Sequence, residues 1–180
     1  MKKRAILLLT VVCVLLSVCA CGKKKEETTE AEKTENPVIA DCASFVNEKL
    51  PAISKDRDEA VALYNEGFTG DSVDPQKVLS SLKNTAIPKM EIYINALSAI
   101  ETTTDEVTQL KDCYLRSAQK QYEAMKMVVS AIEGENSDYL MQADNLISEA
   151  DKLLAEFDTK LADIVKANGM VMKSTSSDAQ

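Results

Sequence analysis

The side chains of this 180-residue chain that could do chemistry are five cysteines and 29 aspartates and glutamates, and the sequence contains no histidine. Histidine is the commonest general base near neutral pH and a frequent metal ligand, so its absence excludes most catalytic triads, zinc enzymes and phosphorelays. Lysines and arginines number only 21, which leaves a net charge of -8. Because such a chain has no excess of cations to neutralise phosphates, we expect no nucleic acid partner.

Paired carboxylates could perform acid-base catalysis if a cleft held them in different environments. Here they lie mainly off the apolar stripes of the expected helices and alternate with lysines, with Glu156 and Lys160 at the favourable i,i+4 spacing. We therefore interpret them as solvated helix faces. The sequence has no glycine-rich phosphate loop, EF-hand pattern or nucleophile elbow, so we expect no enzymatic activity, catalytic residue, cofactor or metal.

Cys42 and Cys113 could form a disulfide outside the cell. In the expected topology they lie on diagonal helices, where their Cα atoms exceed the ~7 Å limit for bridging. We favour two small buried apolar residues, and the bridged form stays an alternative.

Two prolines interrupt the helical pattern, and each removes a hydrogen bond to the carbonyl four residues earlier. Those carbonyls belong to Asn47, before Pro51, and to Asn84, before Pro88. The chain lengths place both prolines at the same height in an antiparallel pair, so facing kinks could form a polar ligand notch at Asn47 and Asn84. Ordinary curvature, or a break that makes residues 38–49 a separate short helix, is the alternative.

The first residues have the pattern of a secretory signal. Lys2, Lys3 and Arg4 precede an apolar run over residues 5–18, which is shorter than the ~20 residues that a membrane-spanning helix needs. The run ends in Leu-Ser-Val-Cys-Ala-Cys-Gly at residues 16–22.

This ending resembles the lipobox of bacterial lipoproteins, in which an aliphatic residue lies three positions before the modified cysteine and a small residue lies one before it. Val18 and Ala20 fit if Cys21 is modified, although Cys19 departs from the usual middle residue. The resemblance implies removal of residues 1–20 and a diacylglyceryl anchor on Cys21. Two acyl chains give stable anchoring, and Lys23, Lys24 and Lys25 would then meet the membrane surface, where each can add ~1 kcal/mol.

Residues 21–37 continue from the lipidated cysteine as a charged tether. Between positions 23 and 36 the sequence has no aliphatic residue larger than alanine, so it cannot bury enough surface to fold. We expect a disordered linker that keeps the following domain close to the membrane.

From residue 38 onward apolar residues recur at helical spacing. Helices are expected over residues 39–66, 75–100, 105–133 and 138–168, with Asp74, Thr103 (in a capping box with Glu106) and Ser137 as N-caps. The clearest stripe, in the last helix, is Leu140, Ala143, Ile147, Ala150, Leu154, Phe157, Leu161 and Ile164.

Short connections make sequential helices antiparallel. The predicted fold is therefore all-α, an up-down-up-down four-helix bundle over residues 38–172 with kinks at Pro51 and Pro88, followed by a disordered tail at 173–180. Residues 110–164 are similar to helical hairpins in small lipoproteins of Gram-positive bacteria, a resemblance that implies no activity.

We expect a non-catalytic binding or scaffolding lipoprotein on the extracytoplasmic face of the cell membrane, with an envelope protein or peptide as partner. The resemblance implies a Gram-positive cell. The alternative is a receptor that holds a small ligand or peptide in an interhelical groove.

Overall fold

A computed structural model describes residues 36–69 and 73–168. Its regular elements are all helical, and no strand occurs within these two ranges. The all-α class is therefore confirmed. The predicted signal at 1–20, nearly all of the tether at 21–37 and the tail at 173–180 lie outside the described residues.

The first helical run consists of α1 (Pro37–Ser44), the π-helical segment η1 (Phe45–Lys49) and α2 (Leu50–Gly67). The run is continuous, so residues 38–49 belong to it and do not form a separate helix. Asn36 caps its start, because the Asn36 side chain accepts a hydrogen bond from the Val38 amide at 3.0 Å.

The second run has the same construction, with α3 (Pro75–Ser81), η2 (Leu82–Ala86) and α4 (Ile87–Ser98). Asp74 caps it as predicted, since its Oδ1 accepts hydrogen bonds from the Gln76 and Lys77 amides at 2.9 and 3.3 Å. In both runs the π-helical segment ends two residues before a proline. The backbone hydrogen bonds thus change to i→i−5 spacing just before the proline, which lacks an N–H donor.

The two long helices are α5 (Asp105–Glu133) and α6 (Asp138–Ala167). The predicted capping box of α5 is wrong: its N-cap is Thr104, which makes no side-chain capping bond. Ser137 is the N-cap of α6 as predicted, but the capping side chain is Asn136, whose Oδ1 accepts from the Asp138 amide at 2.9 Å.

The hydrophobic core lies where the helices contact one another. The predicted stripe of α6 is buried from Ala143 to Ile164 except at Ile147, which is half-buried. Leu140 is 40% exposed, which corrects its assignment to the core, because it lies in the first turn of α6 at one end of the molecule. The largest fully buried side chains include Phe45, Leu82, Met90, Tyr93, Leu97, Leu110 and Met125.

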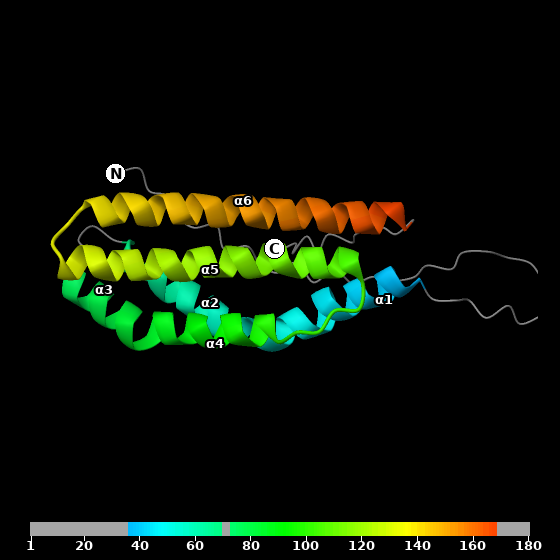
Figure 1. Ribbon diagram of the computed structural model, residues 1–180. Helices are drawn as coiled ribbons and strands as arrows, with labels where there is room; N and C mark the ends of the chain where they lie inside the picture. Colours follow the sequence, from blue (N-terminus) through cyan, green and yellow to red (C-terminus); the bar gives the residue numbers. More distant parts are fainter. Residues whose placement is uncertain (1–35, 70–72, 169–180) are drawn as a thin grey trace, which may run out of the picture.

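Figure 1 shows α5 and α6 side by side along their lengths, while α4 packs on α2 and α5, and α1 packs on α5 and α6. At one end, here called the distal end, lie the end of α2, the start of α3 and the α5–α6 turn, within residues 64–78 and 133–144. At the opposite, proximal end the Asn36 side chain donates to Asn168 Oδ1 at 2.6 Å.

Contacts between the first two helical runs set their register. Lys89 binds Asp56 and Glu59, and Lys49 Nζ donates to the Glu101 carbonyl at 2.7 Å. Pro88 therefore lies about two helical turns, on the order of 10 Å, from the level of Pro51. The two prolines do not face each other, contrary to the prediction from chain lengths.

Candidate functional site

The residues of the predicted membrane anchor, Cys21 and Lys23 to Lys25, lie outside the described residues. Their roles therefore stay predictions that the structure leaves untouched.

The two asparagines of the predicted notch are in different surroundings. Asn47 is half-buried in η1, and its Oδ1 is buried without a hydrogen-bond partner among the described residues. Asn84 is exposed in η2, and its Nδ2 donates to Ser80 Oγ at 3.1 Å. The helix register separates them by roughly 20 Å, so the structure does not bring the two amides together. Ligand binding at either one stays a prediction.

A buried carboxylate that the sequence analysis missed joins α1 to the start of α5. The Asp41 side chain is 6% exposed, and its Oδ2 accepts hydrogen bonds from the Thr103 and Thr104 amides at 2.8 Å and from Thr104 Oγ1 at 2.9 Å. Asp41 thus satisfies backbone donors just before α5, including the Thr103 amide that the predicted capping box assigned to the Glu106 side chain.

These hydrogen bonds set the charge state at the proximal end. Burial alone would raise the pKa of Asp41, but the hydrogen bonds from Thr103 and Thr104 together outweigh it and lower the pKa below its ordinary value. The neighbouring thiol responds in the opposite direction: burial, and then the Asp41 charge, raise the pKa of Cys42 to about 11. A charged carboxylate and a protonated thiol therefore lie side by side.

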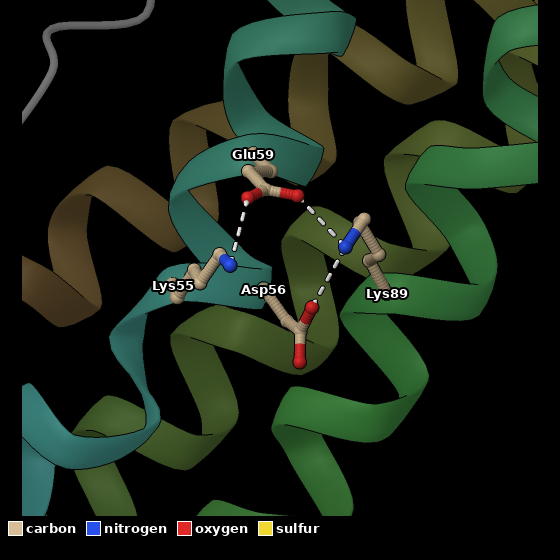
Figure 2. A network of polar contacts seen from close by, with 4 residues as sticks. All are labelled: Lys55, Asp56, Glu59 and Lys89. Carbon is tan, nitrogen blue, oxygen red and sulfur yellow. Dashed lines mark hydrogen bonds and ion pairs between the residues drawn. The ribbon is translucent and has the colours of Figure 1, made fainter.

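A second polar network joins α2 to α4, as Figure 2 shows. Lys89 Nζ lies 2.8 Å from Asp56 Oδ1 and 2.7 Å from Glu59 Oε2, and Lys55 Nζ lies 3.9 Å from the other oxygen of Glu59. Hydrogen bonding to Asp56, and then to Glu59, raises the pKa of Lys89 to about 12. The lysine is thus held charged between two carboxylates, an arrangement suited to holding helices together.

Buried aromatic residues surround one cation inside the molecule. Arg57 is 6% exposed, and its guanidinium carbon lies 5.7 Å from the centre of the Tyr114 ring, itself 4.9 Å from the Phe157 ring. The Arg57 Nη1 is paired with Asp58 Oδ1 at 3.7 Å. Desolvation raises the pKa of the buried Tyr93 far above its ordinary range, so its hydroxyl stays neutral. These contacts account for packing.

Both described cysteines are free and buried, so the favoured interpretation of Cys42 and Cys113 as small buried residues is confirmed, and the alternative of a disulfide between them is absent. A shallow hollow of about 180 Å³ lies beside Cys113, with charged walls that include Arg116, Glu156 and Lys160. Within the described ranges, no three side chains of ligating type are grouped as a metal site would need.

Most of the large apolar side chains that reach solvent in the described ranges lie at the distal end, and the exception is Ile92 on α4. A hollow of about 190 Å³ between the end of α2 and the start of α3 is lined by Leu63, Val73 and Val78 together with Glu66 and Lys77. The exposed large apolar side chains at this end are Phe68 (45% exposed), Val73 (48%), Leu140 (40%) and Met141 (63%).

Comparison with known proteins gives one positive result. A family model described as EMYY-motif containing lipoprotein matches residues 1–169. No curated protein and no solved structure matches the chain. The run Glu-Met-Tyr-Tyr does not occur in this sequence, so the description assigns no residue here a role. Among the described helices, none is long and apolar enough to span a membrane.

Proposed function

The chain belongs to the EMYY-motif containing lipoproteins, and we propose from this membership that a lipid on Cys21 holds it on the extracytoplasmic face of a Gram-positive cell membrane. The helical body would act there without catalysis, as a binding or scaffolding module for another envelope protein.

The observation that carries this proposal is the separation of the two ends of the molecule. The described body begins at Asn36, at the proximal end, whereas four of the five exposed large apolar side chains in the described ranges lie at the distal end. Helix α5 has 29 residues and is therefore about 43 Å long. A body tethered through residue 36 would present its distal end away from the anchor.

The proposed body is an up-down-up-down bundle with changes of direction at Pro51 and Pro88. Two features support it: sequential helices contact each other, and π-helical turns precede both prolines.

The proposed absence of catalysis has support in the surroundings of the carboxylates. Asp41 is the only buried carboxylate within residues 36–69 and 73–168, and Thr103 and Thr104 already engage its charged oxygen. A general acid or base would need an available carboxyl in a cleft.

Detergent phase partitioning of the full chain produced in its cell tests the anchor. The unaltered protein and Cys19→Ala should enter the detergent phase with an N-terminal peptide that carries lipid on Cys21, whereas Cys21→Ala should stay in buffer. The two substitutions are chemically identical and two positions apart, so they separate anchoring from a general effect on export. An unmodified N-terminus, or lipidation of Cys19, would contradict the proposal.

Photocrosslinking in intact cells tests the module itself. A photoreactive amino acid at Met141 should yield a defined adduct with an envelope protein, and the same group at Ile92, which is 57% exposed on α4, should not. Equal adducts at both positions would argue against a specific partner.

A further inference from the structure

Exposed apolar side chains from the end of α2 and the start of α6 make up the surface of the distal end. The Phe68 ring packs on Tyr64 with 5.2 Å between ring centres. The end of α2 and the start of α6 lie at the same end of the molecule (Figure 1), and burial, and then the charge of Asp144 on α6, raise the pKa of Tyr64 to about 12. Leu140 and Met141 precede Asp144 by four and three residues, so all three share a helix face.

This surface is acidic as well as apolar. No lysine or arginine occurs in residues 58–76 or 127–151. Among the nearest cations, Lys77 pairs with Glu66 at 3.6 Å and Lys83 pairs with Glu133 at 2.6 Å, while the exposed Lys126 lies 5.2 Å from the centre of the Tyr122 ring. Further carboxylates exposed at this end are Asp74, Glu135, Asp138 and Asp144.

We infer that the distal end docks a basic, amphipathic segment of a partner protein, which places apolar side chains on Phe68, Leu140 and Met141 and lysines or arginines against the surrounding carboxylates. The inference rests on the proposed function and adds the location and chemistry of its partner. Flexible Met141 suits such a contact because methionine adapts to irregular apolar surfaces. Opposite charge would guide the encounter and fix the orientation.

Charge complementarity favours this occupant over two others. An anionic lipid surface would repel the carboxylates around Leu140 and Met141. A second copy would bring the same acidic surface against itself, at a cost from like charges. Of these three occupants, only a basic amphipathic segment complements both the apolar side chains and the carboxylates of the surface.

The test uses the full lipidated chain in phosphatidylcholine nanodiscs. The probe is a labelled amphipathic peptide of leucine and lysine, about 14 residues long, and binding is followed by fluorescence anisotropy. Substituting Leu140→Ser together with Met141→Ser should weaken binding at least about fivefold, as should Glu135→Gln with Asp138→Asn. The matched controls, Ile92→Ser and Glu91→Gln with Asp112→Asn, should leave it unchanged.

Several results would overturn the inference: equal losses in the controls, equal binding of a peptide with glutamate in place of lysine, binding of the Cys21→Ala chain to phosphatidylglycerol vesicles that the Leu140 and Met141 changes abolish, or self-association that the same changes abolish. Detergent partitioning of the same samples reports the anchor separately. Absence of peptide binding by the unaltered protein, with intact partitioning, would refute the docking surface alone.

Discussion

At the scale of single residues, Asp41 connects distant parts of the chain. Its carboxylate receives three hydrogen bonds from residues more than sixty positions later. We expect Asp41→Asn to lower the free energy of unfolding by about 1–3 kcal/mol. The hydrogen bonds from Thr103 and Thr104 would lose their charge assistance, and the buried amide would match these donors less well than the carboxylate does. Urea denaturation measures the change. Asp112→Asn, on the exposed face of α5, is the control and should stay within about 0.5 kcal/mol. Equal effects of the two substitutions would contradict the role assigned to Asp41.

The same carboxylate predicts a pH dependence. Its folded-state pKa lies below the ordinary value of 3.8, so the unfolded chain binds its proton first as the pH falls. The stability that Asp41 contributes should be complete above the unfolded pKa and should disappear as the pH falls through the folded pKa. Unfolding curves of the unaltered protein and Asp41→Asn should therefore converge in acid. A constant difference down to the lowest pH would show that ionisation of Asp41 is not the cause.

Sequence reasoning found residue types more readily than residue partners. Asp74 was recognised as a cap because its partners, Gln76 and Lys77, are adjacent in sequence. Asp41 was missed because its partners Thr103 and Thr104 are distant in sequence, and an aspartate within a helical pattern gives no local signal of such a bond. Asn136 and Ser137 are both capping types, so only geometry distinguishes which side chain bonds the Asp138 amide.

At the scale of helices, two leucines of the same predicted stripe of α6 differ in their surroundings. Leu154 is 7% exposed, whereas Leu140 is 40% exposed. We expect Leu154→Ala to cost about 2–5 kcal/mol of unfolding free energy, because it leaves a cavity against α5. Leu140→Ala should cost less than about 0.5 kcal/mol. Chemical denaturation compares the two, and a similar loss at both would mean that Leu140 is covered in solution.

The ion pairs of Lys89 between α2 and α4 predict that stability depends on salt concentration. Replacing Lys89 by methionine leaves Asp56 and Glu59 close together without their shared cation. Because the network is at the surface, we expect a small decrease in Tm at low ionic strength that largely vanishes in roughly 1 M salt. Lys55→Met, which removes a 3.9 Å contact to Glu59, should have less effect. A decrease unaffected by salt would point to lost packing of the lysine stem.

The helices themselves were largely predictable, and their register was not. Apolar spacing and the N-cap residues Asp74 and Ser137 placed the helix ends within about two residues. The π-helical segments η1 and η2 each add a wider turn, which shifts the register of the residues that follow relative to a regular α-helix. A periodicity with constant spacing cannot contain such a shift.

At the scale of the whole molecule, the two ends have different tasks in the proposed function. The hydrogen bond between the Asn36 and Asn168 side chains puts the first and last described residues together at the proximal end. Leu140 and Met141, with the carboxylates of Glu135 and Asp138, are exposed between the far end of α5 and the start of α6. The net charge of -8 should repel the helical body from the anionic membrane surface to which its N-terminus binds.

This arrangement predicts unequal distances to the membrane. A dye at Met141→Cys should transfer less energy to acceptor lipids in phosphatidylglycerol vesicles than a dye at Glu101→Cys, because the two ends of α5 are about 43 Å apart. The native thiols should not compete for the dye, since Cys42 and Cys113 are buried and burial raises both pKa values. Labelled protein with Cys21→Ala should show no transfer. Equal transfer from both positions would mean that the body lies flat on the membrane, and the distal end would then not be presented to a partner.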